Sequence, residues 1–141
     1  MRKSTFHKIE DILRDYPRMD DYIKQREEEL RYPMQTDDDN VGGGRSNYPD
    51  RDQPVRTLIT IDEDRRLNGL KREQRIIKQC FNTSDKDTRI IITELYFNRH
   101  PRYTLRGLVT MQVVMVSRNR AYQLRNGFIK ECADQLGLID L

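Results

Sequence analysis

Apolar residues in this chain recur every three or four positions, in short stretches separated by proline and turn-forming residues. The longest purely apolar runs span only a few residues, such as VVMV at 113–116, so we expect no membrane-spanning segment. Hydrophobic residues make up 35% of the 141 residues, and charged residues make up another 35%. Such a lean apolar content suits several small amphipathic helices better than a thick sheet core. We therefore predict a mainly α-helical protein.

Residues 1–32 predict an N-terminal helical hairpin. Ser4 is a candidate cap for the first helix, and Pro17 breaks it. The second helix is expected from about residue 18 to residue 31, and Tyr32-Pro33 ends it. The apolar stripes are Phe6, Ile9, Leu13 and Tyr16 in the first helix and Met19, Tyr22, Ile23 and Leu30 in the second. The hairpin has two alternative uses, which are packing on the C-terminal helices or forming a dimer interface. The residues in question are Phe6, Ile9, Leu13, Tyr16 and Tyr22.

Residues 33–56 are predicted to be a linker or a functional loop, because Pro, Gly and Asp dominate and apolar residues are few. The GGGRS motif within it lacks the GxxxxGK[ST] spacing of a phosphate-binding loop. This segment also contains several aspartates, and carboxylates are ligands that suit Mg²⁺, so a metal-dependent nuclease is a further hypothesis. Consecutive residues of a loop cannot all converge on one ion, however, and we expect neither an enzyme nor a metal site. The carboxylates in question are Asp37, Asp38, Asp39 and Asp50.

The cysteine and histidine content excludes further classes of site. Cys80 and Cys132 are the two cysteines and form no CxxC pair, while His7 and His100 are far apart. A zinc site and a disulfide framework are therefore not expected, and no cofactor is implied. The N-terminal MRKSTFHKIED turns acidic before any apolar run, so it does not predict a signal peptide. We expect a cytoplasmic protein with reduced thiols.

Residues 57–141 predict a helix-turn-helix domain that follows a weakly alternating segment, VRTLITI at 55–61. Asp62 is a candidate cap for a long helix that runs to about Phe81. Ser84 with Asp87 is a loose capping-box analogue for the next helix, at about 85–97, and Pro101 bars its continuation. The apolar stripe of the long helix consists of Leu67, Leu70, Ile77 and Phe81, with Ile76 and Cys80 beside it.

The last part of the chain has the pattern of a short helix, a turn and a second helix. Thr104 is positioned as the N-cap of the short helix and Ser117 as the N-cap of the second. This order is typical of a helix-turn-helix. The residues expected to pack inward are Ala121, Leu124 and Phe128 of the second helix, against Leu108 and Val109 of the first and against the helix that precedes them.

Charge is unevenly distributed. Residues 1–52 have a net charge of −3 and residues 53–141 a net charge of +6, while residues 95–130 contain seven basic residues and no Asp or Glu. A solvated helix usually mixes the two signs, so a long stretch of one sign indicates a polyanionic partner, most often nucleic acid. For reading base edges we predict Arg118, Asn119, Arg120, Tyr122 and Gln123. For the phosphate backbone we predict Arg102, Arg106, Arg125 and Lys130, with Thr104 and Ser117 at the helix starts.

Two stretches also resemble known families. DTRIIITELYFNRHPRYTLRGLV, followed by VSRNRAYQLRNGFI, is similar to the fourth region of bacterial sigma factors. The order of KSTF, YIK, REEELRYP, DNVGGGRSN and DRRLN resembles the RinA-type late transcriptional regulators of phages of Gram-positive bacteria, over nearly the whole chain. This resemblance implies a phage activator that binds double-stranded DNA upstream of packaging and late genes in the host bacterial cell. The similarity to sigma factors makes RNA polymerase a candidate partner. A homodimer is also a candidate, because helix-turn-helix proteins often bind DNA as dimers.

The sequence departs from the RinA-type pattern at one place. YTLRGLVTMQVVMVS, residues 103–117, is about two residues longer than the usual spacing and has no Gly or small polar residue in the turn. Either the first helix is extended or the turn is rebuilt. The alternative function is a DNA-packaging component such as a small terminase subunit, which a ring-shaped assembly would distinguish.

Overall fold

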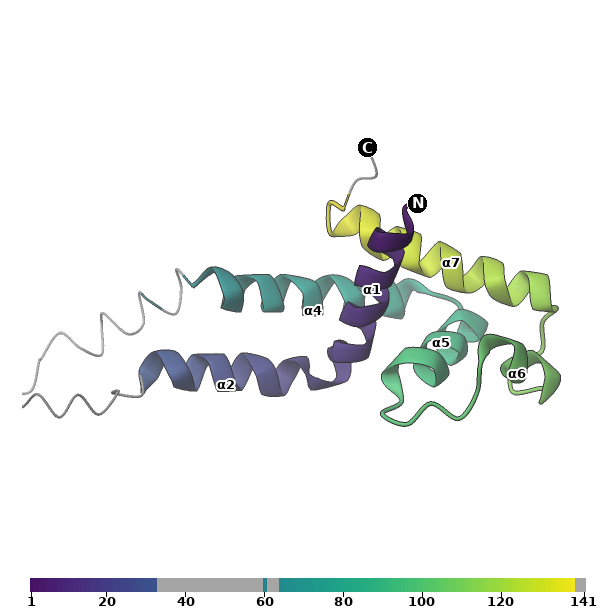
Figure 1. The fold of residues 1–141 in the computed structure, drawn as a ribbon, viewed down its shortest axis with the longest axis horizontal. Helices are drawn as coiled ribbons and strands as arrows, with labels where there is room; N and C mark the ends of the chain where they lie inside the picture. The colour runs from purple at the N-terminus through teal and green to yellow at the C-terminus, as the bar shows by residue number, and fades with distance from the viewer. Residues whose placement is uncertain (33–59, 61–63, 139–141) are drawn as a thin grey trace, which may run out of the picture. The chain divides into compact units, whose positions relative to one another are not determined.

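A computed structural model describes residues 1–32, 60 and 64–138, and the described residues contain helices and turns but no strand (Figure 1). The prediction of a mainly helical protein is confirmed. The predicted linker 33–56 and the Asp62 cap lie outside the described residues, as does all of 55–61 except Thr60. The helices are α1 (Lys3–Asp15), the 3₁₀ turn η1 (Tyr16–Arg18), α2 (Met19–Arg31), α4 (Arg65–Thr83), α5 (Lys86–Ile92), the π-helical turn η2 (Thr93–Phe97), α6 (Leu105–Thr110) and α7 (Arg118–Gln135).

The chain divides into two compact units, and the division passes through the predicted N-terminal hairpin. The first unit comprises Met1–Met19 and Arg72–Leu141, and the second comprises Asp20–Lys71. Consequently α1 shares a unit with α5, α6, α7 and most of α4, whereas α2 shares a unit with the start of α4. Pro17 does end α1, but it does so within the 3₁₀ turn η1, whose flanking residues Asp15 and Met19 keep right-handed helical backbone angles.

The core of the first unit is built from both ends of the chain. Ile9 and Leu13 of α1 are fully buried in one cluster with residues of α4 and α7. The ring of Tyr16 lies 4.9 Å from that of Phe97, centroid to centroid. Of the two uses proposed for the stripe of the first helix, the structure therefore shows packing on the C-terminal helices. The other buried members of this cluster are Ile12, Met19, Ile76, Ile77, Cys80, Ile92, Tyr96, Phe128, Ile129, Cys132 and Ala133.

The start of α1 differs from the prediction. The helix begins at Lys3, and the extended residue Arg2 occupies the cap position without a side-chain hydrogen bond. The amide of Phe6 donates to the carbonyl of Arg2 over 3.0 Å, which already closes the first turn. Ser4 therefore lies inside the helix, and the prediction that it caps α1 is wrong, because the helix starts two residues earlier than a cap at Ser4 requires.

Asp85, rather than Ser84, caps α5. The Asp85 carboxylate accepts from the amide of Thr88 over 3.3 Å and from the Thr88 hydroxyl. Ser84 instead donates its hydroxyl to the carbonyl of Cys80 over 2.7 Å, so it closes the end of α4. The predicted pairing of Ser84 with Asp87 is wrong by one position, since Asp is as good an N-cap residue as Ser. The predicted end of this helix before Pro101 is confirmed, because η2 ends at Phe97 and Asn98 is extended.

Both cysteines are buried and free, facing the same core from α4 and α7. Burial raises the pKa of the Cys80 thiol and, more strongly, the pKa of the Cys132 thiol. The two residues therefore pack as small apolar side chains, as their type and surroundings predict.

In the second unit, α2 is joined to the start of α4 by charged side chains. Arg26 donates from Nε to Oδ1 of Asp64 over 3.3 Å and from Nη2 to Oδ2 over 2.9 Å. Asp64 also accepts from the amide of Leu67 over 2.8 Å, which makes it the N-cap of α4. Lys71 forms a second link, with Nζ lying 3.3 Å from Oε1 of Glu27. The same carboxylate thus caps one helix and holds another.

Candidate nucleic-acid interface

The short helix α6 begins as the sequence predicts. Thr104 has an extended backbone, and its Oγ1 accepts from the amide of Gly107 over 3.1 Å. Leu105 and Leu108 are buried in a second apolar cluster, where Ile91 of α5 also lies. The hydroxyl cap and two inward leucines explain why six residues suffice to form this helix, since burial rather than length stabilises it.

Helix α6 ends at Thr110, and a tight turn follows it. Its end has the hydrogen bonds of a Schellman motif: the amide of Val113 donates to the carbonyl of Leu108 over 2.9 Å, and that of Gln112 donates to Val109 over 3.1 Å. Gln112 has φ = 55°, the left-handed conformation in which glycine is usual. Val114 is buried behind the turn. The turn thus takes the glycine-type geometry without a glycine.

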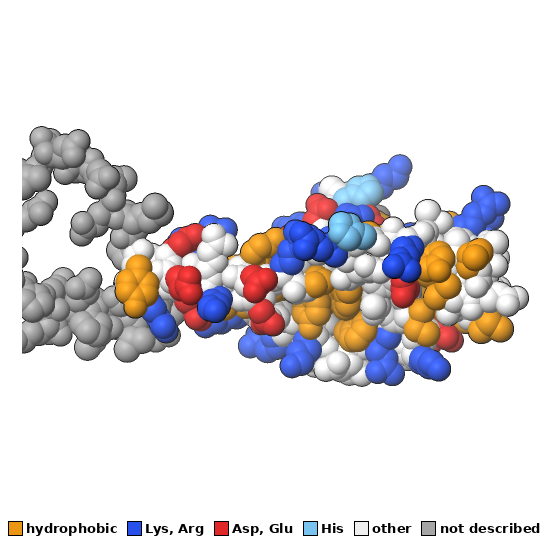
Figure 2. Space-filling view, turned by 90° about the horizontal axis from the view of Figure 1, so that it is seen from below, with side chains coloured by type: hydrophobic (Ala, Val, Ile, Leu, Met, Phe, Trp, Pro, Cys, Tyr) orange, Lys and Arg blue, Asp and Glu red, His pale blue; other side chains and the backbone are white. Residues whose placement is uncertain are grey.

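Two methionines of this turn are exposed, which the pattern of the sequence did not identify. Met111 is 65% exposed and Met115 is 78% exposed. The unusually apolar stretch TMQVVMV was the only signal, and it did not distinguish buried from exposed positions. Figure 2 shows hydrophobic side chains at the end of the molecule that carries α6, with Lys and Arg side chains among them.

The long helix α7 has one buried side and one polar side. Ser117 caps it, because its Oγ accepts from the amide of Arg120 over 3.2 Å. Ala121 and Phe128 are buried, and Leu124 is half-buried against the cluster that contains Leu108. The predicted inward residues and both predicted N-caps of this part of the chain are confirmed.

The residues predicted to read bases lie on the first two turns of α7. Arg118, Asn119, Arg120 and Gln123 are all exposed. Tyr122 is half-buried, and two arginines lie near its ring. The guanidinium of Arg118 is 5.9 Å from the ring centroid, and that of Arg125 is 5.2 Å from it. These distances are within the range of cation–π contacts, which orient both arginines. Arg118 remains exposed.

Arg125 has a structural contact that sequence reasoning missed. Its guanidinium lies 5.3 Å from the ring centroid of Phe6, so α1 borders the polar side of α7. It also donates from Nε and Nη2 to Oδ1 of Asn126, over 3.1 Å and 3.0 Å. The sequence contains no pattern that predicts this contact, because Phe6 and Arg125 lie near opposite ends of the chain.

The remaining predicted phosphate contacts are exposed. Lys130 lies on α7, Arg106 on α6 and Arg102 in the loop before α6. In the described part of the chain, none of the basic residues predicted to contact DNA forms an ion pair with a carboxylate; these are Arg102, Arg106, Arg118, Arg120, Arg125 and Lys130. The positive charge of α6, α7 and the preceding loop is therefore uncompensated from within these residues.

Two features of the described residues bear on other classes of site. No described helix is both long and apolar enough to cross a membrane. Within the same ranges, no three His, Cys, Asp or Glu side chains are grouped so as to hold a metal ion. Asp37, Asp38, Asp39 and Asp50 lie outside the described residues.

Comparison with known proteins places the chain in a family and finds one similar phage protein. A family model described as "Protein of unknown function (DUF722)" matches residues 6–134, so the chain belongs to this family. The chain is also 29% identical over 141 residues to the protein named Transcriptional activator rinA of Staphylococcus phage phi11. That alignment covers 97% of this chain and 94% of the relative, and it confirms the resemblance to the RinA-type family. No solved structure matches the chain.

Proposed function

We propose that this protein is a sequence-specific DNA-binding transcriptional activator that acts on phage late or packaging genes. The observation that carries the proposal is the exposed first turn of α7, whose three side chains Arg118, Asn119 and Arg120 follow a capped helix start. The order of α6, turn and α7 supports a helix-turn-helix in this proposal. The relative named as a transcriptional activator supports the same class of function.

In this proposal α7 is the recognition helix. Arg118 and Arg120 would donate bidentately to guanine O6 and N7, while Asn119 and Gln123 would pair with adenine. The inward packing of Ala121 and Phe128 supports this role, because it holds the opposite side of the helix in the core. The exposed side is then free to enter the major groove.

Phosphate contacts would set the position of the helix on the duplex. Lys130 on α7, Arg106 on α6 and Arg102 before α6 are exposed cations without a carboxylate partner among the described residues. Such contacts add affinity that does not depend on sequence and that falls as salt rises. Thr104 and Ser117 cap α6 and α7, the two helices that carry Arg106 and Lys130.

A fluorescence-polarisation titration tests the proposal. The wild-type protein should bind a pool of phage promoter-region DNA more tightly than random DNA, with a log–log salt slope of about −0.9 for each phosphate neutralised. Arg118→Ala and Arg120→Ala should each reduce the preference for specific DNA by about 1–3 kcal/mol, whereas Lys130→Ala should weaken both pools equally. Arg75→Ala, an exposed arginine on α4, is the matched control.

Two outcomes would contradict the proposal. Equal binding of both pools at low salt, lost together as salt rises, would mean that only the DNA backbone is contacted. The packaging alternative would then lead, and light scattering that shows a ring-sized assembly would support it. Unchanged preference in both arginine variants would remove the first turn of α7 from the base-reading role.

A further inference from the structure

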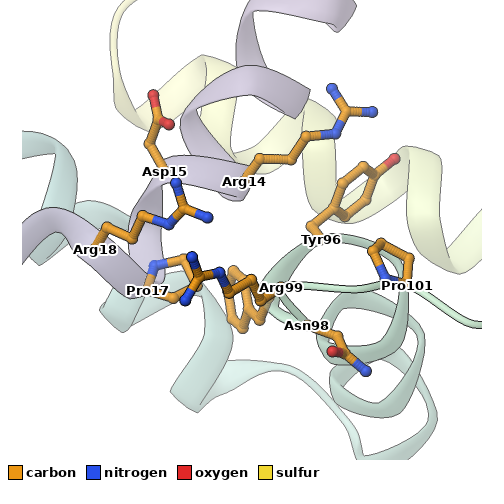
Figure 3. A pocket seen from close by; sticks show the side chains of 9 residues that line it. Arg14, Asp15, Pro17, Arg18, Tyr96, Asn98, Arg99 and Pro101 are labelled. Carbon is orange, nitrogen blue, oxygen red and sulfur yellow. The ribbon is translucent and has the colours of Figure 1, made fainter.

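A pocket of about 340 Å³ lies in the first unit, between the end of α1 and the loop that follows η2 (Figure 3). It has apolar walls and a cationic rim, contributed by segments that are far apart in the sequence. The residues that matter here are Pro17 and Arg18 of η1, Arg14 of α1, and Phe97, Arg99 and Pro101 around the end of η2. Two prolines and an aromatic ring give the pocket rigid sides.

Two of its three arginines are uncompensated. Arg14 is already engaged, because Nη1 lies 3.2 Å from Oδ1 of Asp11 and its guanidinium lies 5.6 Å from the Tyr96 ring centroid. Arg18 and Arg99 are exposed and form no ion pair among the described residues. In Figure 3 their side chains extend toward each other. Two guanidinium groups at one concave site attract an anion, because each raises the potential at the other.

The Asp15 side chain does not supply that anion. Asp15 also borders the pocket, but Figure 3 shows its carboxylate turned away from Arg99. Arg18 and Arg99 are therefore open to an anionic group from a bound partner. A guanidinium fork matches a carboxylate or a phosphate bidentately, so the walls of the pocket decide between them.

The position and the walls of the pocket favour a carboxylate on a protein. In Figure 1 the amino end of α7 lies at the far end of this unit from the carboxyl end of α1, so the pocket is separate from the proposed recognition turn. Pro17, Phe97 and Pro101 offer apolar surface, which suits the side chains around an acidic residue better than a hydrated sugar–phosphate backbone.

We propose that this pocket receives an acidic side chain, flanked by apolar residues, from a protein partner of the DNA-bound activator. The inference rests on the proposed function, because an activator bound to DNA acts through a second protein. RNA polymerase is the enzyme on which any activator ultimately acts, and it is therefore the probe. Arg18 and Arg99 bind the carboxylate, and the prolines and Phe97 contact the residues beside it.

The experiment measures two affinities of one double variant. Arg18→Glu with Arg99→Glu reverses both charges, and Arg75→Glu with Lys78→Glu on α4 is a control with the same change in net charge at exposed positions. Binding to purified bacterial RNA polymerase holoenzyme is measured without DNA, and binding to the specific DNA is measured without polymerase. The pocket variant should bind polymerase at least about tenfold more weakly than the control, because like charges then face each other. The two variants should bind DNA equally.

Each result of this experiment either supports or overturns the proposed role of the pocket. Equal polymerase binding by the two variants, or no binding of polymerase by the wild-type protein, overturns the proposal. A loss of DNA affinity in the pocket variant beyond that of the control also overturns it, since the pocket would then bind DNA phosphates. Failure of the wild-type protein to bind DNA would refute the proposed function instead, while the polymerase measurement would still test the pocket. Helical circular dichroism of both variants confirms that they fold.

Discussion

The hydroxyl of Tyr96 donates a 2.7 Å hydrogen bond to Oε2 of Glu10, joining η2 to α1 across 86 positions of the sequence. Glu10 also contacts His7, with Nδ1 2.9 Å from Oε1, and Arg14, with Nη2 3.8 Å from Oε2. Tyr96 is almost fully buried, and burial raises the pKa of its hydroxyl, with a further contribution from the bond to Glu10. This bond fixes α1 on the unit that carries α6 and α7.

Tyr96→Phe should destabilise the protein by about 1.5 kcal/mol, because it removes a hydrogen bond to a charged acceptor. Urea unfolding followed by circular dichroism measures the loss. Tyr103→Phe is the control, since no hydrogen bond is described for that half-buried hydroxyl. The raised pKa of Tyr96 also makes the stability of the fold depend on pH. The contribution of the hydroxyl is complete below the ordinary tyrosine pKa of about 10 and is lost as the pH rises through the higher pKa of the folded protein. Equal stability of the two variants would show that the bond contributes nothing.

Thr104→Ala and Ser117→Ala should each cost about 1 kcal/mol, because each removes the side-chain acceptor at the start of a helix. Thr104→Ser and Ser117→Asp should restore most of the loss, since both retain an acceptor oxygen. Thr110→Ala is the control on α6, where the hydroxyl only donates back to the carbonyl of Arg106. Thermal unfolding ranks the five variants, and a control as damaging as the cap variants would contradict the assignment of the caps.

The ends of α6 and α7 have the same Schellman hydrogen bonds with different residues in the left-handed position. Gln112 has φ = 55° after α6, and Gly137 has φ = 74° after α7. Gln112→Gly should therefore stabilise the protein by up to about 1 kcal/mol, and Gly137→Ala should destabilise it by about 1 kcal/mol. A Cβ at position 137 would meet no atom closer than 3.9 Å, so the cost is in the backbone.

Gln112→Ala separates the backbone from the side chain in this comparison. It keeps a Cβ in the left-handed position and should leave stability nearly unchanged, as measured by urea unfolding. A large loss in Gln112→Ala would mean that the glutamine side chain, rather than the turn conformation, determines the effect of changing this residue.

Asp64 should titrate below its ordinary pKa, first because Arg26 donates to it and second because the amide of Leu67 does. A carboxylate with a lowered folded pKa stabilises the fold above its unfolded pKa of about 3.9, and this contribution disappears as pH falls through the folded value. Carboxyl titration by NMR should show the pKa of Asp64 moving upward in Arg26→Ala. Arg31→Ala, an exposed change at the end of α2, should leave it in place. No movement in Arg26→Ala would exclude the ion pair in solution.

Local signals in the sequence determined the helical class and the region from Thr104 to Phe128. Hydroxyl caps at Thr104 and Ser117 act within one turn, and the spacing of Ala121, Leu124 and Phe128 identifies the buried side of a helix. Both kinds of signal depend on residues three or four positions apart, so they can be read without a fold. Where two cap residues adjoin, as at Ser84 and Asp85, the local signal misplaced the helix start by one residue.

Only the tertiary structure determined which segments of the chain pack against each other. It placed α1 in the core of the C-terminal helices, set Phe6 against Arg125, and brought Arg18 and Arg99 to one pocket. It also showed that Gln112 takes the left-handed turn and that Met111 and Met115 face solvent. Apolar periodicity indicates that a side is buried but not against which partner, because many amphipathic helices fit one another equally well until the whole core packs.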